Sequence, residues 1–211
     1  MTRHSPEPPS PASRALDLAE DPFSLFAAWL KEAERSEPAD PNAMAVATVD
    51  SEGLPNLRMI LLKGADSHGF VFYTNCGSAK GLELAANPKA ALLFYWKSLH
   101  RQVRMRGPIA PVTDAEADAY FATRSRESRI GAWASDQSRP VESREALDAS
   151  YEARAKEFEG RDIPRPPHWH GYRLVPLEIE FWVGGRHRLH DRIAFHRPSP
   201  AASWTKTRLY P

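Results

Sequence analysis

Short apolar and β-branched runs separated by turns recur along most of the chain and restrict the folds open to it. Their length and composition are typical of β-strands. Five runs lie before residue 110 and four after residue 171: 43–49, 57–63, 69–75, 90–96 and 102–109, then 172–175, 178–183, 187–195 and 204–209. A short turn with a glycine, DSEG at 50–53, joins the first two runs and predicts a hairpin there.

Helical patterns are inserted between these runs without alternating with each of them. Asp21-Pro22 has the form of an N-cap followed by proline, and apolar residues then recur at helical spacing. Thr113 and Glu116 have the form of a capping box. Further helices are expected over residues 78–86, 125–133 and 143–158. Many short strands with inserted helices predict a mainly β fold, an antiparallel barrel with helical excursions, and not a doubly wound parallel sheet.

Composition excludes several classes of protein. The hydrophobic and charged fractions, 42% and 26%, are ordinary for a soluble globular protein. A formal net charge of +1 argues against a general nucleic-acid or acidic-membrane binder. No apolar run is long enough to span a bilayer. The single cysteine, Cys76, fits a reducing compartment, so we expect a cytoplasmic protein.

The beginning of the chain is rich in proline and serine and has no apolar signal core. We expect residues 1–20 to be a disordered tail. The remaining residues, 21–211, are enough for a single domain with a core of its own.

The segment RLHDR at 188–192 is the most informative for chemistry. On a strand, Arg188, His190 and Arg192 share one face, with Leu189 and Asp191 on the other. Three potential cations on one face favour an anion or a carboxylate among them. A solvated edge strand is the alternative explanation of the same pattern.

Tyr120, Arg124 and Ser128 form a second candidate cluster. If Ser125 begins a helix, Ser128 and nearby backbone N–H groups lie at its positive end, which suits a phosphate. Arg124 adds a fork of donors that matches phosphate oxygens. Ordinary surface charges remain the alternative.

Two further segments carry cations near apolar strands. RMILLK at 58–63 has a cation at each end, and these would face opposite ways on an unbent strand. The pattern fits either a phosphate clamp or strand ends whose cations extend to solvent, and the sequence does not decide between them. The residues 73–75, followed by 78–80 at a helix start, could form another anion site, with a capped helix as the alternative.

Other site types are not indicated. The chain has no GxGxxG and no Walker loop, which argues against a Rossmann or P-loop nucleotide site. His187 and His190 would face opposite ways on a strand, and His168-Trp169-His170 has no cysteine or acidic partner. We therefore expect no metal site.

Taken together, the segments resemble the pyridoxamine/pyridoxine 5′-phosphate oxidase family over nearly everything from Asp21 to the C-terminus. The segments are RMILLK (58–63), FYTN (72–75), SAKG (78–81), WKSLHRQVRMRG (96–107), YFATRSRESRIGAWAS (120–135), QSRP (137–140), IEFWVGG (179–185) and RLHDR (188–192). The resemblance implies an FMN-binding antiparallel split β-barrel of Greek-key type, and a homodimer with FMN at the subunit interface. It also implies oxidation of pyridoxamine 5′-phosphate and pyridoxine 5′-phosphate to pyridoxal 5′-phosphate, with hydride transfer to FMN and reduction of O2 to H2O2.

By motif position the resemblance also implies a set of site residues. The FMN contacts would be Arg58, Met59, Ile60, Leu61, Leu62, Lys63, Tyr73, Thr74, Ala79, Lys80, Gln102, Gln137, Ser138, Trp182 and Arg192. The substrate contacts would be Lys63, Tyr120, Arg124, Ser128, Arg188, Leu189 and His190, with Arg188 and His190 as the catalytic residues. Ala79 stands where many members carry an arginine that meets the FMN phosphate. The N-terminal segment has no counterpart of the Arg-and-Tyr lid of some members.

Two other functions fit parts of the pattern. One is a split-barrel flavin or deazaflavin-dependent reductase, which would need a nicotinamide or deazaflavin donor. The other is a non-catalytic module that binds FMN or pyridoxal phosphate. The RLHDR segment argues against the second, because a flavin binder has no need of Arg188 and His190.

Overall fold

The structure, a computed structural model, describes residues 10–211. Its strands, in chain order, are β1 (Ala43–Val49), β2 (Pro55–Leu61), β3 (Gly64–Asp66), β4 (Gly69–Asn75), β5 (Lys89–Trp96), β6 (Arg101–Pro111), β7 (Trp169–Leu174), β8 (Glu178–Val183), β9 (Asp191–His196) and β10 (Thr205–Leu209). Its helices are α1 (Pro11–Leu18), α2 (Pro22–Ser36), α3 (Ala79–Ala86), α4 (Asp114–Thr123), α5 (Arg126–Ala134) and α6 (Arg144–Glu157), with a short 3-10 turn, η1 (Arg186–Arg188).

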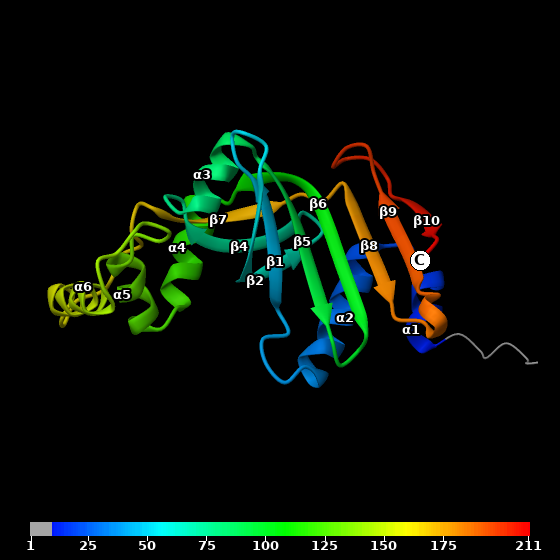
Figure 1. Ribbon diagram of the computed structural model, residues 1–211, viewed down its shortest axis with the longest axis horizontal. Helices are drawn as coiled ribbons and strands as arrows, with labels where there is room; N and C mark the ends of the chain where they lie inside the picture. Colours follow the sequence, from blue (N-terminus) through cyan, green and yellow to red (C-terminus); the bar gives the residue numbers. More distant parts are fainter. Residues whose placement is uncertain (1–9) are drawn as a thin grey trace, which may run out of the picture.

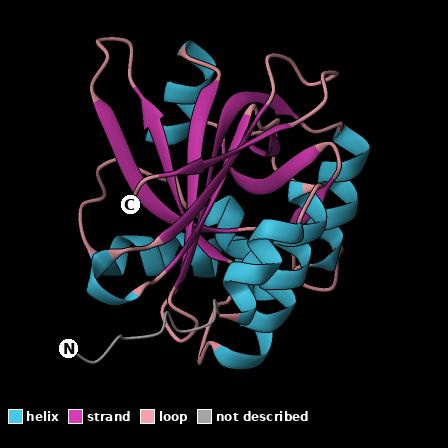
Figure 2. Ribbon diagram, turned by 90° about the vertical axis from the view of Figure 1, so that its right-hand side faces the viewer, coloured by secondary structure: helices cyan, strands magenta, loops and turns pink. Residues whose placement is uncertain are grey.

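The strands form one antiparallel sheet in the order β10-β9-β8-β6-β5-β1-β2, to which β7, β4 and β3 are added. Figure 2 shows the strands as a curved sheet with helices packed around it. Strand β6 joins the two parts. Its first residues, Arg101 to Arg106, pair with β8, and its last, Ile109 to Pro111, pair with β7. The backbone N–H of Lys63, just after β2, donates to the carbonyl of Val71 in β4 at 2.8 Å. The end of the edge strand β2 therefore also contacts the part of the sheet formed by β3, β4 and β7. The antiparallel, partly closed barrel predicted from the sequence is confirmed.

Helix α2 fills the inside of this curved sheet. It begins as expected, with the Asp21 carboxylate accepting from the backbone N–H of Ser24 at 2.8 Å. Phe26 and Trp29 lie on its apolar face and are each 1% exposed. The Phe26 ring packs edge-on against Phe94 at a centroid distance of 5.1 Å, and Trp29 packs against strand β8. Aromatic contacts of this kind add to the area that they bury, so α2 anchors the core.

Helices α4, α5 and α6 form an excursion between β6 and β7 at one end of the molecule, away from β8, β9 and β10 at the other end (Figure 1). The predicted capping box at the start of α4 is present: Thr113 Oγ1 accepts from the Glu116 N–H, and the Glu116 carboxylate accepts from the Thr113 N–H at 2.9 Å. In the described part of the chain, no helix is long and apolar enough to cross a membrane.

Part of the expected N-terminal tail is ordered. The prediction of a disordered tail over residues 1–20 is wrong for residues 11–18, which form α1, while residues 1–9 lie outside the described residues. Ser10 caps α1 and Pro11 occupies its first position. Leu16 is completely buried in the main core. The proline and serine content of the segment gives no sign of this burial.

A continuous strand was predicted for residues 187–195. The prediction is wrong for the first part of the RLHDR segment. Arg188 belongs to the turn η1, and β9 begins only at Asp191. His187 and Arg188 have φ values of 55° and 64°, the left-handed region that a strand does not use. Arg188, His190 and Arg192 therefore do not share one strand face.

One face of the sheet is left without a covering layer in the described chain. Side chains of β2 and β5 make it apolar, and we call this surface the uncovered face: Leu57, Met59, Leu61, Leu93 and Tyr95. Leu57 and Met59 are 66% and 64% exposed, and Tyr95 is 49% exposed. Clustered exposed apolar side chains of this kind mark interaction surfaces.

Candidate active site

A cavity of about 800 Å³ opens between the end of β2, β4 and the helices α4 and α5. Most residues that the resemblance assigned to cofactor or phosphate binding line it: Arg58, Met59, Ile60, Leu61, Lys63, Tyr73, Thr74, Lys80, Tyr120, Arg124, Ser128 and Gln137. Arg58 and Lys63, expected to face opposite ways on an unbent strand, both reach the cavity because β2 ends at Leu61.

Aromatic rings hold one wall of the cavity in place. The rings of Tyr73 and Tyr120 are stacked at 4.2 Å, and Tyr73 also stacks on Trp169 at 5.1 Å. The Arg124 guanidinium lies over the Trp169 ring at 5.0 Å. This contact orients the side chain of Arg124 without neutralising its charge.

Arg124 is an incompletely satisfied cation. Its Nη1 is buried and has no hydrogen-bond partner among residues 10–211, and it forms no ion pair with a described carboxylate. Burial lowers the pKa of Arg124 from its ordinary value, and the smaller opposing effect of Tyr120 does not offset it. A buried donor without a partner is costly, so this geometry favours an anion.

The start of α5 lies beside Arg124. Ser125 caps the helix and accepts from the Ser128 N–H at 3.2 Å, as the sequence predicted. The Ser128 hydroxyl is 3.0 Å from the Ser125 hydroxyl, and both residues line the cavity. Backbone N–H groups at a helix start attract negative charge, which adds to the effect of Arg124.

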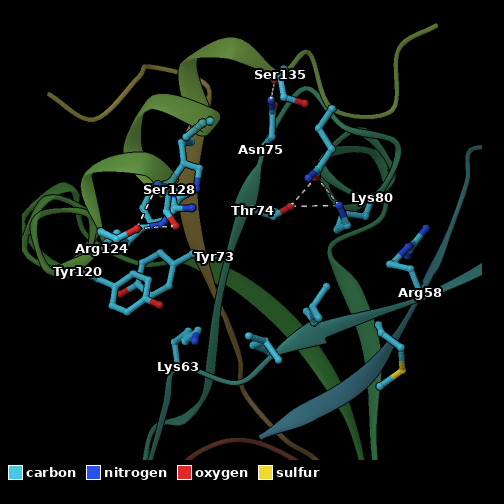
Figure 3. A pocket seen from close by; sticks show the side chains of 18 residues that line it. Arg58, Lys63, Tyr73, Thr74, Asn75, Lys80, Tyr120, Arg124, Ser128 and Ser135 are labelled. Carbon is cyan, nitrogen blue, oxygen red and sulfur yellow. Dashed lines mark hydrogen bonds between the residues drawn. The ribbon is translucent and has the colours of Figure 1, made fainter. Parts of the chain in front are cut away.

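A second polar cluster centres on Lys80, which is 8% exposed. Its Nζ donates to Gln137 Oε1 at 2.7 Å, to Thr74 Oγ1 at 3.1 Å and to Ser78 Oγ at 3.2 Å. Burial, and then the charge of Arg58, lowers the pKa of Lys80. Figure 3 shows this cluster across the cavity from Tyr120, Arg124 and Ser128.

Arg58 is already paired. Its Nη2 lies 3.0 Å from the Glu83 carboxylate on α3, and its Nη1 donates to Thr48. Glu83 also accepts from the Asn56 amide at 2.8 Å. Burial raises the pKa of Glu83, but the hydrogen bonds from Thr48, Asn56 and Arg58 outweigh it and lower the pKa overall.

Three predicted contacts lie outside the cavity lining. The side chain of Leu62 is 5% exposed and belongs to the main core. Ala79 is the first residue of α3, where its methyl group does not reach the cavity. Ser138 lies in the exposed loop after α5, with a φ of 70°.

The other predicted residues lie away from this cavity. Gln102, Trp182 and Arg192 stand opposite one another on β6, β8 and β9, so their side chains share the side of the sheet that carries the uncovered face. Trp182 and His190 line another cavity, of about 600 Å³. Arg188 and Leu189 are exposed in the turn beside it. A single chain therefore carries the predicted residues in two groups and does not bring them together.

Two buried carboxylates that hold the predicted arginines were not found from the sequence. Glu83 fixes Arg58, and Glu180 accepts from Nε of both Arg192 and Arg104, at 2.9 Å and 2.8 Å. The position of Glu180 in β8, two residues before Trp182, was the available signal, because alternate strand residues share a face. The third member of the aromatic wall, Trp169, was also missed; it lies in a loop-like sequence, although it begins β7.

Sequence comparison identifies relatives over the whole chain. Residues 30–157 match the family described as pyridoxamine 5′-phosphate oxidase, and residues 169–211 match the pyridoxine 5′-phosphate oxidase C-terminal dimerisation region. A protein of Azorhizobium caulinodans named pyridoxine/pyridoxamine 5′-phosphate oxidase is 59% identical over 100% of both chains. One of the same name from Rhizobium etli is 62% identical, over 90% of this chain and 93% of its own.

Solved structures agree with this grouping. PhzG from Burkholderia lata, in complex with tetrahydrophenazine-1-carboxylic acid, superimposes with a TM-score of 0.87 at 33% identity, over 97% of this chain and 98% of its own. A pyridoxamine 5′-phosphate oxidase-related, FMN-binding protein from Nostoc punctiforme shares the fold, with a TM-score of 0.71 at 20% identity over 93% and 100%. The matched family, the full-length relatives and the shared split-barrel fold lead to one conclusion: this chain belongs to the pyridoxamine 5′-phosphate oxidase family.

Proposed function

We propose that the protein is an FMN-dependent oxidase that converts pyridoxamine 5′-phosphate and pyridoxine 5′-phosphate into pyridoxal 5′-phosphate. The observation that carries the proposal is Arg124, a partly buried side chain whose buried Nη1 has no hydrogen-bond partner among residues 10–211, at the edge of a cavity that has a second cationic cluster on its opposite wall. A phosphorylated cofactor and a phosphorylated substrate together bring two phosphates, which matches two separate clusters. The names of the relatives support the same substrates.

The residues present fit FMN. Lys80 and Thr74 are buried and form a polar cluster with Gln137, and Arg58 of β2 lines the same cavity. When bound there, FMN would supply the hydride acceptor and the means of passing electrons to O2. Lys80 and Arg58 would hold its phosphate, with Arg58 shared with Glu83, since no arginine is present at Ala79.

The substrate phosphate would be held by Arg124, Ser128, Tyr120 and Lys63. Arg124 would bind as a fork of donors, and the N-terminus of α5 would add backbone donors. Binding energy from this remote group would orient the reacting carbon of the substrate toward the cofactor. Arg188 and His190 would contact the pyridine ring of the substrate.

We propose that the active site is completed in a homodimer. Within one chain, Gln102, Trp182 and Arg192 lie on the side of the uncovered face, and none of them lines the cavity that holds the Lys80 cluster. The uncovered face is apolar and reaches Met59 and Leu61, which also line the cavity. A second copy packed there would bury this surface and bring its own Gln102, Trp182 and Arg192 to the cavity, as expected for a two-fold interface. The match of residues 169–211 to a dimerisation region supports this arrangement.

The first test is the reaction itself. Purified protein with added FMN and pyridoxamine 5′-phosphate should consume O2 and form aldehyde and H2O2 in equal amounts, without a nicotinamide or deazaflavin donor. A requirement for such a donor would identify a reductase. FMN binding without turnover would identify a non-catalytic module. Oxidation of a reduced phenazine carboxylate in preference to the phosphorylated substrate would contradict the role given to Arg124.

A second test separates a shared site from one built within a single chain. Arg124→Ala and Arg188→Ala subunits, co-expressed with different tags, form mixed dimers. If the site combines Arg124 of one subunit with Arg188 of the other, each mixed dimer has one intact site, and random assembly recovers about one quarter of the wild-type activity. If both residues come from the same subunit, co-expression recovers none. We place this reaction in the cytoplasm, in keeping with the unpaired Cys76.

A further inference from the structure

The loop between β8 and β9 fixes the ring of His190 through one backbone contact. The N–H of Gly185 donates to Nδ1 of His190 at 3.1 Å. A backbone N–H is only a donor, so Nδ1 must present its lone pair. A neutral imidazole has one N–H, and that proton is therefore on Nε2.

The ring has little freedom to leave this contact. The Trp182 ring packs against His190 at a centroid distance of 4.5 Å and an angle of 42°. The loop contains a tight turn, in which the Leu189 N–H donates to the Arg186 carbonyl at 3.0 Å. His187 and Arg188 hold left-handed backbone conformations in this turn, a strained arrangement that persists only where the surroundings enforce it.

Only a glycine fits at position 185 in this loop. A Cβ built on Gly185 would lie 1.9 Å from the carbonyl oxygen of Leu189 and 2.7 Å from its carbonyl carbon. Both are backbone atoms, which cannot move aside as a flexible side chain can. Any larger residue must therefore open the loop and pull the Gly185 N–H away from His190.

We propose that Gly185 is a positioning residue that holds His190 in the Nε2–H tautomer, so that His190 donates a hydrogen bond to the substrate and does not act as the base. This inference rests on the proposed function, in which His190 contacts the substrate. With Nδ1 occupied by Gly185 and Nε2 protonated, the neutral ring has no free lone pair. The Nε2–H would donate to the oxygen or nitrogen on the reacting carbon, and the proton that this group loses passes to water.

The direct test reads the tautomer without measuring activity. In protein labelled with ¹⁵N-histidine and loaded with FMN, the His190 signals are assigned by their loss in His190→Asn. At alkaline pH the spectrum should show a protonated Nε2 and an unprotonated Nδ1. A protonated Nδ1 would overturn the proposal. An Nε2–H tautomer in a protein that does not turn over the substrate would support the positioning role of Gly185 and contradict the proposed oxidase function.

Kinetics of two substitutions test the donor role. Glutamine places an amide donor near the position of Nε2 but has no basic nitrogen, so His190→Gln should keep kcat within about tenfold of wild type. His190→Ala, which has no donor, should lose at least another tenfold. Equal losses in the two variants would show that basicity is required and would contradict the donor role.

The role of Gly185 has its own matched pair. Gly185→Ala should lower kcat and introduce the Nδ1–H signal, while FMN still binds. Gly64→Ala is the control, because its Cβ would meet Val71 at 3.5 Å, an ordinary contact, and its activity should stay near wild type. A Gly185→Ala protein with a pure Nε2–H signal would show that the glycine does not set the tautomer.

Discussion

The carboxylate of Glu180 holds Arg192 through a 2.9 Å hydrogen bond to Nε, while Nη1 of the same guanidinium donates to the Tyr210 carbonyl at 2.8 Å. Glu180 is 4% exposed and also accepts from Arg104. The chain thus places Arg192 at a fixed angle beside Trp182 before any ligand binds.

We expect Glu180→Gln to weaken FMN binding about tenfold, because an uncharged partner holds Arg192 less firmly. It should also lower the free energy of unfolding by about 1–3 kcal/mol, since a buried ion pair loses one partner. Glu178→Gln is the control: Glu178 lies on the same strand as Glu180, but its ion pair with Arg106 is more exposed, so the substitution should cost less than about 0.5 kcal/mol. Fluorescence titration and urea unfolding measure the two effects. Similar losses in both variants would contradict the assignment.

The same pair predicts a pH dependence. Burial raises the pKa of Glu180, but the hydrogen bonds and charges of Arg192 and Arg104 outweigh it, so the folded-state pKa is lowered. Its stabilisation is therefore present above the unfolded-state pKa of about 4.3 and is lost as pH falls through the lower folded-state pKa. The stability difference between wild type and Glu180→Gln should shrink below about pH 4. A difference that stays constant with falling pH would mean that the ionised carboxylate is not its source.

Arg124→Ala should raise KM for pyridoxamine 5′-phosphate at least tenfold, about 1.4 kcal/mol or more, with a smaller effect on kcat. The reason is the loss of a guanidinium whose buried Nη1 has no partner among the described residues and which we propose to bind the substrate phosphate. Unphosphorylated pyridoxamine is the internal control, because its KM should change little. A defect confined to kcat would contradict a phosphate anchor.

Ala79→Arg should lower the Kd for FMN several-fold by adding a cation at the start of α3, near Lys80. Ala85→Arg adds the same charge at the exposed end of the same helix and should leave FMN affinity unchanged. Fluorescence quenching on titration of the apoprotein gives both values. Equal affinities would show that position 79 does not face the phosphate.

Arg188→Ala should lower kcat/KM at least tenfold, about 1.4 kcal/mol or above, because Arg188 is proposed to contact the substrate ring. Arg144→Ala, on the exposed helix α6, should have no effect. Steady-state O2 consumption measures both. Unchanged kinetics for Arg188→Ala would remove this residue from the site.

Local patterns predicted much of the fold. The cap at Asp21, the capping box at Thr113 and the alternating runs gave the helices and strands close to their observed positions, because each depends on neighbours in sequence. The left-handed turn at His187 could not be read this way, since those residue types do not require it. Leu16 was misjudged because the partner that buries it lies far along the chain.

Motifs predicted which residues belong to the candidate site, but not how these residues are arranged in the fold. The resemblance named Lys80, Arg124 and Trp182 and implied FMN at a subunit interface, but it did not say which of these residues lie apart within one chain. Trp182 does not line the cavity that Lys80 and Arg124 line. Glu83 was missed because a carboxylate that holds an arginine has no sequence signature of its own, and Glu180 was missed because its alternation with Trp182 along the strand was not used. The role of Glu180 follows from the antiparallel register of β6, β8 and β9, and the role of Glu83 follows from the contact of α3 with Arg58.

The double pairing of β6 also affects how the chain is made. Arg101 in β6 pairs with Val183 in β8, and Ile109 pairs with Leu174 in β7, so one edge of β6 has no partner until the last quarter of the protein leaves the ribosome. An unpaired strand edge is a site for wrong association, and non-local pairing slows folding. The α4–α6 excursion lengthens this interval, so a nascent chain that stops after α6 exposes an unpaired edge of β6 until β7 and β8 emerge.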